Sequence, residues 1–386
     1  MKVMNKFFLF FRKDISAYCT LLIVVLASMV VLWLPFLLHQ QSWLGLSIPN
    51  ADFSYIYKQF DGPLYIIPAK TAYNPAQIQT LDRDPVFPHN PRYFAAHLPL
   101  YPFFIYLGSF ILGYLKSMVG VSVFFTILLT FAFYSIVKKM KLTEHPLLLS
   151  SVMLFLPRFL VVRSTGASEP LFMLCVLLSL FAFEKKKYWL AGIMGALASM
   201  TKTPGILLFV AYTLVYVESL IKKEKWNWNW LGIMFIPLGL VGVFGLYALQ
   251  FKDFFAYFHT GGVVPMPYPF SAFNFRAQWV GTAWLEDILF YFGLYLLTAV
   301  TLWKSKNRSF FYFSLVFVTA TLFVQHRDIS RYSLPLWPVA CITFERFFTS
   351  KKFVFVGAIL LIGIYMYAWN FMTYNIMPIS EWLPFL

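Results

Sequence analysis

Charged residues are scarce in this chain of 386 residues. Asp, Glu, Lys and Arg make up 12% of the sequence, whereas hydrophobic residues make up 60%. Apolar runs without a charge recur from one end to the other, and a water-soluble fold of this length does not tolerate such runs. The composition therefore excludes a soluble globular protein and predicts an all-α polytopic membrane protein.

Cysteine is also scarce, and it carries no motif. Cys19, Cys175 and Cys341 lie inside apolar runs, without the CxxC or Cys/His spacing of a metal site. Neither a disulfide framework nor a zinc site is indicated, and we expect all three to be buried small hydrophobic residues. Internal repeats and low-complexity tracts are absent as well, so residues 1–386 are predicted to form a single domain.

Basic residues, in contrast, are grouped. Four lie in the first 13 residues, and three lie in each of five clusters at 138–141, 185–187, 222–225, 304–308 and 346–352. Together these groups hold 19 of the 31 Lys and Arg residues. They follow every second apolar run, which is the positive-inside pattern of cytoplasmic loops. Topology thus explains the net charge of +15, and nucleic acid is not an expected partner.

Eleven apolar runs are predicted to cross the bilayer, with the N-terminus in the cytoplasm and the C-terminus outside. The first is longer than a signal-peptide core and lacks a cleavage site, so we expect it to be retained. The run 98–115 is predicted to be an interfacial helix, because counting it as a span would invert every later basic cluster. The eleven are 15–38, 117–137, 146–162, 170–183, 188–201, 203–219, 228–250, 288–303, 309–325, 332–345 and 353–372.

Three of these spans are short. The runs 170–183, 188–201 and 203–217 have fewer residues than the ~20 that a helix needs to cross the hydrocarbon layer. Glu169 and Lys202 lie at their outer ends. Either these side chains snorkel to the headgroups, or the helices end early around a water-filled recess. Two such ends together favour the recess.

Two large outer loops are expected, at 39–116 and 251–287. The first contains four of the sixteen carboxylates, namely Asp52, Asp61, Asp82 and Asp84. An acid-bearing polar segment at the end of a membrane helix is where water-dependent chemistry can meet a lipid. We therefore predict that 39–116 is a catalytic loop with interfacial helices.

Five short motifs follow one another along the chain. They are FDGPLY at 60–65, HLPLYP at 97–102, SEPLFM at 168–173, TKTPG at 201–205 and RYSLPLWP at 331–338. In this order they resemble the PIG-V-like glycosyltransferases of the GT-C superfamily, although Phe60 replaces the usual Trp and Lys202 the usual Arg. The resemblance implies a GT-C-like bundle that transfers a sugar with inversion.

The resemblance also implies the substrates. In many members of the family the sugar is mannose, and the donor is a dolichyl or related polyprenyl monophosphate. The acceptor is expected to be a glycolipid or another lipid-linked or free glycan, at the non-cytoplasmic membrane face. We expect a monomer in the plasma membrane of a prokaryote, or in the endoplasmic reticulum membrane of a eukaryote.

Asp61 is the predicted general base. An inverting transfer needs a carboxylate that takes the proton of the acceptor hydroxyl while the phosphate leaves from the opposite face of the sugar. Gly62 and Pro63 are a turn signal that fixes the backbone behind this carboxylate. A lone Asp-Gly-Pro is by default a turn or N-cap residue. The position after the first helix, together with the family motif, favours catalysis.

Cations at the outer helix ends are candidates to bind the donor phosphate, where negative charge develops as the bond breaks. The predicted phosphate ligands are Arg331, Lys202, Arg163 and His326. Arg158 and Lys116 are instead expected to anchor helices at the headgroups. Substrate contacts are predicted for Glu169, His97, Tyr65 and Tyr101. For His97, a satisfied interfacial histidine is the alternative.

Asp82, Arg83 and Asp84 have the DxD spacing with which metal-dependent transferases hold a divalent cation against a diphosphate. A monophosphate donor offers no diphosphate to bridge, and the prolines that surround this motif suit an exposed loop. We therefore expect neither a metal nor another cofactor. Asp82 and Asp84 are the fallback metal ligands.

Two other classes of protein must be weighed. Arg163, Glu169 and Lys202 would also suit the substrate path of a transporter or lipid flippase. That hypothesis predicts inverted repeats and discontinuous helices near the membrane midplane, and the sequence shows no such symmetry. A membrane scaffold would not need polar residues at so many outer helix ends. The glycosyltransferase hypothesis is preferred because it also explains the acidic outer loop.

Overall fold

The computed structural model describes residues 14–81, 90–225, 227–260, 265–278, 280, 285–379 and 381–386. Within these ranges the regular structure is helical, apart from isolated bridges and one hairpin. The hairpin pairs β1 (Ser42–Trp43) with β2 (Leu46–Ser47) in antiparallel register, with Ser42 opposite Ser47. The prediction of an all-α protein is confirmed.

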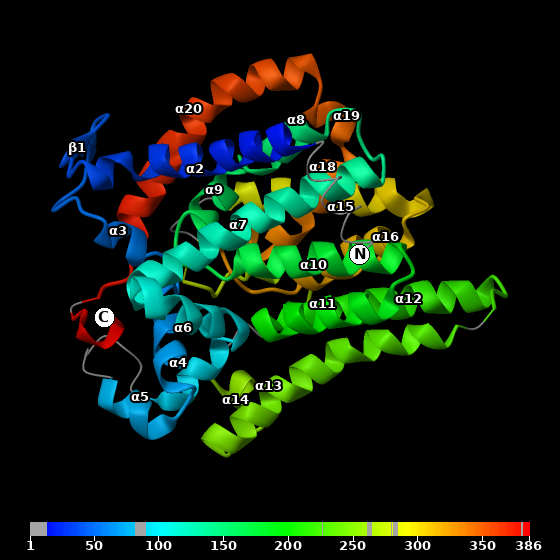
Figure 1. Cartoon of the computed structure of the whole chain (residues 1–386), viewed down its shortest axis with the longest axis horizontal. Helices are drawn as coiled ribbons and strands as arrows, with labels where there is room; N and C mark the ends of the chain where they lie inside the picture. The colour runs from blue at the N-terminus through cyan, green and yellow to red at the C-terminus, as the bar shows by residue number, and fades with distance from the viewer. Residues whose placement is uncertain are drawn as a thin grey trace.

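Six helical segments of the described chain are long and apolar enough to cross a bilayer, and a bent pair makes a seventh (Figure 1). The pair is α8 (Pro146–Met153) and α9 (Pro157–Arg163), bent by 77°. Pro157 opens α9 and lacks the N–H that would continue α8. These segments confirm an integral multi-pass membrane protein. The six are α2 (Ile15–Leu37), α7 (Tyr114–Lys139), η3 (Thr203–Ile206) with α12 (Leu207–Ile221), η4 (Trp228–Met234) with α13 (Phe235–Phe251), α15 (Glu286–Thr301) with η6 (Leu302–Lys304), and α20 (Lys351–Tyr374).

The remaining predicted spans fold as shorter helices. α11 (Tyr188–Thr201) has 14 residues and rises only about 21 Å, less than the ~30 Å hydrocarbon layer. All eleven predicted runs are largely helical. Only six or seven of these helical segments are long enough to cross a bilayer, so the prediction of eleven spans is not shown. The others are α10 (Glu169–Glu184), α16 (Arg308–Leu322), η7 (Leu334–Leu336) with α18 (Trp337–Thr343), and α19 (Glu345–Phe348).

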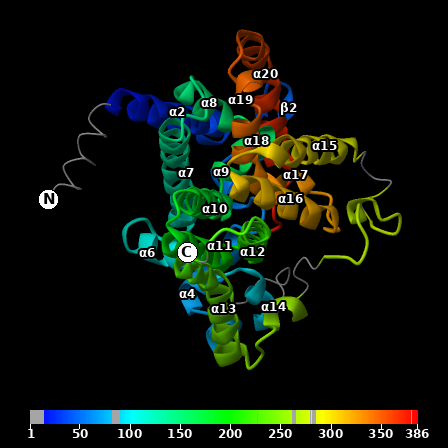
Figure 2. The same ribbon diagram turned by 90° about the vertical axis from the view of Figure 1, so that its right-hand side faces the viewer.

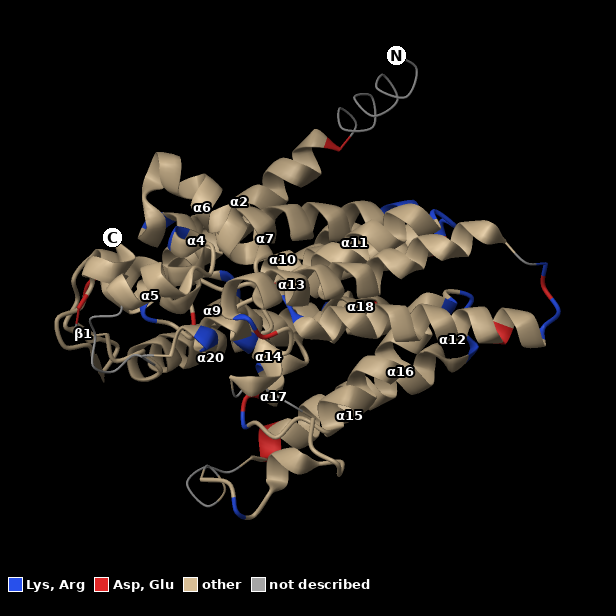
Figure 3. Ribbon diagram, turned by 90° about the horizontal axis from the view of Figure 1, so that it is seen from below, with Lys and Arg blue, Asp and Glu red and all other residues tan. Residues whose placement is uncertain are grey.

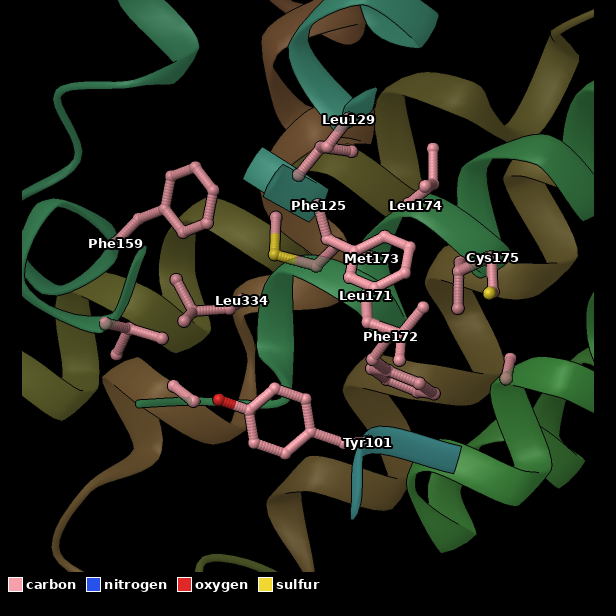
Figure 4. Packing of buried hydrophobic residues seen from close by; sticks show 14 of the residues in the cluster. Tyr101, Phe125, Leu129, Phe159, Leu171, Phe172, Met173, Leu174, Cys175 and Leu334 are labelled. Carbon is pink, nitrogen blue, oxygen red and sulfur yellow. The ribbon is translucent and has the colours of Figure 1, made fainter. Parts of the chain in front are cut away.

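α10 is the centre of the bundle. It packs against α7 and α11, and α11 in turn packs against α13 (Figures 1 and 2). Because α10 is apolar all round, it is buried on almost every side. Leu171, Phe172 and Met173 of this helix lie in one cluster with Phe125 of α7 and Leu334 of η7 (Figure 4). The hydrophobic core thus joins distant parts of the chain around one helix.

Two glycines allow a very close helix contact. A Cβ atom on Gly192 of α11 would lie 1.8 Å from the carbonyl oxygen of Gly232 in η4. The absence of side chains at this crossing lets the two backbones approach. The contact fixes the position of α11, which ends immediately before Lys202.

The segment 39–116, predicted to be the first outer loop, folds into short helices at one end of the bundle (Figure 1). The last of them, α6, turns at Gly113, where φ is +72°, and packs back against α7. α6 has 13 residues and an exposed apolar side, properties that suit the predicted interfacial helix. The helices of this loop are α3 (Ser54–Tyr57), η1 (Pro63–Tyr65), α4 (Ile66–Thr71), α5 (Pro75–Leu81), η2 (Pro91–Ala96) and α6 (Leu100–Leu112).

The segment 251–287, predicted to be the second outer loop, is described only in part, because residues 261–264, 279 and 281–284 lie outside the described ranges. It contains α14 (Ala256–His259) and η5 (Ser271–Phe273). Further along, α17 (Ile329–Tyr332) joins α16 to η7, and η8 (Leu383–Phe385) lies near Leu386. α17 is short, but it positions one of the charged residues of the candidate site.

Two of the predicted cytoplasmic clusters meet at one end of the bundle (Figure 3). Glu218 of α12 pairs with Lys222 and with Arg308, at 2.7 Å each. At the same end, the Glu184 carboxylate accepts hydrogen bonds from the backbone N–H and the hydroxyl of Ser309. Because Glu184 ends α10 and Glu169 begins it, these clusters and Glu169 lie at opposite ends of the bundle.

The cysteines behave as predicted at two of three positions. Cys175 and Cys341 are buried, but Cys19 of α2 is exposed. The prediction for Cys19 is wrong because a membrane helix has an outward side as well as a core side. All three are free thiols, so no disulfide joins these residues.

Candidate functional site

Four charged side chains form a chain of alternating sign at the end of the bundle opposite the basic clusters. Arg331 Nη1 lies 3.7 Å from Asp61 Oδ2, and Arg331 Nε donates to Glu169 Oε1 at 2.6 Å. Lys202 Nζ donates to the same Glu169 oxygen at 2.7 Å. The four come from the turn before η1, from α17, from the start of α10 and from the end of α11. We call them the charged chain.

Asp61 lies in a turn that is held on both sides. Before it, the Gln59 side chain donates to the carbonyl oxygen of Met372 in α20 at 2.6 Å. After it, a Cβ atom on Gly62 would lie 2.7 Å from the carbonyl oxygen of Gly166, so glycine is required at this close approach. The Asp61 side chain is 49% exposed, the most accessible of the charged chain. Its carboxylate is fixed by the backbone and open to solvent.

Glu169 is the acid at the centre of the charged chain. It is the first residue of α10, where the positive end of the helix dipole stabilises a carboxylate. Its side chain is only 2% exposed. Oε1 accepts from both cations, whereas Oε2 is buried without a hydrogen-bond partner among the described residues. Since a buried acceptor without a partner is costly, the site has an unused hydrogen-bonding position.

The two cations are held differently. The Arg331 guanidinium carbon lies 4.2 Å from the centre of the Phe60 ring, in a cation–π contact. Burial lowers the pKa of Arg331, but the carboxylates of Glu169 and Asp61 outweigh burial and raise this pKa above its ordinary value. Lys202 caps α11 in an extended conformation, with φ −149° and ψ 138°, and keeps 24% of its side chain exposed. Lys202 is therefore the more accessible cation.

Aromatic residues lie beside the charged chain. The Tyr65 ring meets the rings of His97 and Tyr101 edge to face, with centroid distances of 4.8 and 4.9 Å. The Tyr65 hydroxyl lies 3.1 Å from Ser168 Oγ, next to Glu169. Burial lowers the pKa of His97 to about 4, so this imidazole is neutral at physiological pH.

His97 is not the satisfied interfacial residue of the alternative prediction. It is 4% exposed, and its Nδ1 has no hydrogen-bond partner among the described residues. The Tyr73 hydroxyl donates to the backbone carbonyl of His97 and fixes the chain there. A neutral imidazole held in this way can bind a hydroxyl group through its ring nitrogens.

Of the predicted site residues, Arg163 lies elsewhere and Tyr101 lies behind the site. Arg163 is fully buried and donates to Leu154 O at 3.2 Å and to Ser28 Oγ at 2.8 Å. The bend between α8 and α9 turns Arg163 into the protein, so the structure does not bring it to the charged chain. The Tyr101 hydroxyl donates to Met118 O at 2.6 Å. Tyr101 therefore packs behind Tyr65, and its hydroxyl is already used.

The loop between α16 and α17 carries a second ion pair next to the site. His326 Nδ1 accepts from the backbone N–H of Asp328 at 2.9 Å, and burial lowers the pKa of His326. Asp328 also lies 3.1 Å from Arg158 Nε, whose guanidinium stacks on Phe371 at 4.2 Å. Arg158 is thus an internal ion-pair residue, and its prediction as a headgroup anchor is wrong. Lys116, the other predicted anchor, is exposed.

The fallback metal site is not tested by the structure. The described residues contain no group of three or more His, Cys, Asp or Glu arranged to hold a metal ion. Asp82 and Asp84, the fallback ligands, lie outside the described ranges. In the charged chain, Arg331 occupies the space between the Asp61 and Glu169 carboxylates, where a bridging metal would have to lie.

The charged chain and its aromatic neighbours draw on all five sequence motifs. In chain order, one residue from each is Asp61, His97, Glu169, Lys202 and Arg331. Sequence reasoning missed two contributors, the Ser168 hydroxyl and the Phe60 ring. Both residues lie in these motifs, directly beside the predicted residues Glu169 and Asp61. The motifs therefore marked the right positions, but a sequence motif does not show which side chains point into a site.

Comparisons with known proteins show a structural likeness only. Searches of known protein families and of curated proteins find no match. The crystal structure of the Archaeoglobus fulgidus oligosaccharyltransferase in the apo form matches with a TM-score of 0.50 and 12% identity, over 93% of this chain and 56% of that chain. The same enzyme tethered to an acceptor peptide containing the NVT sequon matches with a TM-score of 0.50 and 13% identity, over 96% and 57%.

At this identity the likeness shows the fold alone. The all-α polytopic bundle is shared with the Archaeoglobus fulgidus oligosaccharyltransferase. This chain spans little more than half the length of that enzyme. Membership of the PIG-V-like family is not shown.

Proposed function

We propose that this protein is an inverting glycosyltransferase. It moves a sugar, mannose by the family resemblance, from a polyprenyl monophosphate to a glycolipid or glycan acceptor at the non-cytoplasmic face. The observation that carries the proposal is the charged chain, in which the half-exposed Asp61 pairs with Arg331, and the buried Glu169 joins Arg331 to Lys202. The PIG-V-like motifs and the GT-C-like fold support it.

In the proposed reaction, Asp61 accepts the proton of the acceptor hydroxyl while the hydroxyl oxygen bonds to the anomeric carbon of the sugar. The bond from that carbon to the phosphate oxygen breaks, and the polyprenyl phosphate leaves with the electron pair. Arg331 and Lys202 compensate the negative charge that grows on the phosphate. The reaction balances without a cofactor.

The order of the charged chain suits inversion. Inversion requires the base and the leaving phosphate on opposite faces of the sugar. Asp61 and Lys202 are the two ends of the charged chain, with Arg331 and Glu169 between them. A sugar bound along the chain then has the base at one end and a cation at the other. The phosphate competes with Glu169 for Lys202 and for Arg331, which both donate to that carboxylate.

A transporter or lipid flippase is the second candidate. Its ionisable residues are expected near the middle of the membrane, on discontinuous helices. Here Glu169 begins α10 and Lys202 directly follows the last residue of α11, so both charges lie at helix ends. This placement favours an enzyme whose site opens at one surface.

The predicted topology is part of the proposal. We propose one domain with eleven spans, in which α10, α11 and α12 end early around a recess that admits water and acceptor. Loop 39–116 carries Asp61, and loop 251–287 lies on the same outer side. The membrane is the plasma membrane in a prokaryote or the endoplasmic reticulum membrane in a eukaryote, and the protein acts as a monomer.

Cysteine labelling tests this topology. In a variant without native cysteines, single cysteines at Asn307 and Thr349 are expected to be shielded from an impermeant thiol reagent in intact cells, because both belong to basic clusters. A cysteine at Tyr268 in the second outer loop is expected to react. Permeabilised cells should label all three. Labelling at Asn307 and Thr349 in intact cells would overturn the eleven-span topology and place 98–115 in the membrane.

Substitution of the two cations tests the donor site. Lys202→Ala and Arg331→Ala are each expected to lower kcat/KM for a polyprenyl monophosphate sugar roughly 10- to 150-fold, since a charge-assisted hydrogen bond is worth about 1.5–3 kcal/mol. Lys252→Ala, which removes an exposed cation beyond the end of α13, is the matched control and should keep wild-type kinetics. Unchanged kinetics in both site variants, with normal folding, would assign Lys202 and Arg331 to helix anchoring instead.

A further inference from the structure

A polar recess lies at the opposite end of the bundle from the charged chain. Its volume is about 410 Å³, and it lies where the C-terminal end of α12 meets η6 and the start of α16. Because Glu184 contacts Ser309 of α16 there, and α10 has 16 residues, this end is about 24 Å from Glu169. The residues that line it are Glu218, Lys222, Trp303, Lys304, Ser305, Arg308 and Tyr312. We call it the basic recess.

The basic recess has a surplus of positive charge. Three cations line it, Lys222, Lys304 and Arg308, against the single carboxylate of Glu218. Glu218 pairs with both Lys222 and Arg308, at 2.7 Å each. Lys304 forms no ion pair with another described residue and is exposed. The lining therefore carries a net charge of about +2, which favours a dianionic or monoanionic ligand.

The recess lies at the membrane boundary. Two of the segments long enough to span, Thr203–Ile221 and Glu286–Lys304, end there. Trp303 at its rim is 63% exposed, as expected of an aromatic residue at the headgroup level. Apolar side chains continue from it along the two helices and are exposed on the protein surface: Val217, Leu220 and Ile221 of α12, and Leu297 and Val300 of α15.

We propose that the basic recess binds the phosphate of an anionic phospholipid. The phosphodiester lies against Lys222, Lys304 and Arg308, and the acyl chains follow the exposed apolar side chains of α12 and α15. A soluble phosphate would leave this apolar surface unused, so the arrangement favours a lipid. This site is separate from the charged chain and does not depend on the proposed reaction.

Native mass spectrometry tests the proposal on the full chain in detergent. With equal amounts of phosphatidylglycerol and phosphatidylcholine added, the wild type is expected to retain phosphatidylglycerol preferentially. The variant Lys222→Gln with Lys304→Gln should lose that retention on the order of 10-fold. The matched control, Lys351→Gln with Lys352→Gln, removes two cations from another basic cluster and should retain the lipid. If the double variant melts early, Lys304→Gln alone, which breaks no ion pair between described residues, replaces it.

Two results would overturn the proposal. Equal retention by the recess variant and the control would show that the lipid is held by general surface charge. The second result is that inorganic phosphate raises the melting temperature of the wild type but not of the recess variant, while phosphatidylglycerol vesicles raise neither. That result would identify a site for soluble phosphate. We expect the wild type to retain phosphatidylglycerol preferentially and only the recess substitutions to remove this preference. This expectation holds whether or not sugar transfer is detected.

Discussion

Asp61→Asn is expected to remove nearly all sugar transfer while the protein still inserts and folds. The amide keeps the size of the side chain but not its basicity, and a general base contributes on the order of 10²- to 10⁴-fold to the rate. Asp61 is half-exposed, and its turn is held by Gln59 and Gly62 rather than by its own carboxylate. The fold should therefore survive the substitution, and the donor should still bind.

The assay is transfer of radiolabelled sugar from a polyprenyl monophosphate to endogenous glycolipid in membranes, with expression and thermal stability measured alongside. Asp52→Asn is the matched control, because the Asp52 carboxylate accepts from the backbone N–H of Ser54 in the same loop at 2.8 Å and does not touch the charged chain. Asp82→Asn and Asp84→Asn should also cost far less than Asp61→Asn.

Two outcomes would contradict the assignment of Asp61. Near-normal transfer by Asp61→Asn would exclude it as the base. An equal loss in Asp82→Asn that added manganese restores would instead favour the metal-dependent alternative. Added divalent metal should recover little activity in Asp61→Asn if the donor is a monophosphate.

Glu169→Gln is expected to be the most destabilising single substitution in the charged chain. Glu169 is 2% exposed, and one of its oxygens accepts from both Lys202 and Arg331. Removing one partner of a buried ion pair leaves uncompensated charge, which costs about 3–5 kcal/mol. Here two cations lose their shared partner, so the free energy of unfolding should fall by roughly that amount.

Thermal melting in detergent measures this effect. Glu345→Gln is the matched control, because Glu345 pairs at 3.7 Å with Arg346, whose side chain is 97% exposed, and such surface pairs contribute about 0–1 kcal/mol. If the two cations are the phosphate site, polyprenyl phosphate should raise the melting temperature of Glu169→Gln more than that of the wild type. Equal melting of the two variants would show that Glu169 does not compensate buried charge.

The positions of the helices could be predicted from the sequence, and their lengths in the membrane could not. Every apolar run that was expected to span is largely helical, because uncharged runs of this composition have few other ways to satisfy their backbone in lipid. Whether a helix of 14 residues such as α11 crosses the bilayer depends on tilt and local thickness. The bend at Pro157 was also not predicted, and it explains why Arg163 points inward.

The residues of the charged chain could be predicted one by one, but not their connections. Asp61, Glu169, Lys202 and Arg331 each stand in a motif, yet spacing along the chain does not tell which cation meets which acid. The structure shows that Glu169 bridges both cations. Lys70 of α4, a short way after the first motif, donates to the carbonyl oxygens of Pro384 and Leu386 far along the chain. Pairing of this kind depends on how distant loops pack.

The most direct test of the central claim is a structure of the Asp61→Asn variant, determined by electron cryo-microscopy with added polyprenyl monophosphate mannose. We expect density for the phosphate within hydrogen-bond distance of Lys202 or Arg331, with the sugar between that phosphate and residue 61. Lipid density that avoids the charged chain, or a substrate bound at the middle of the membrane on a path open to both sides, would contradict the glycosyltransferase mechanism and favour a transporter.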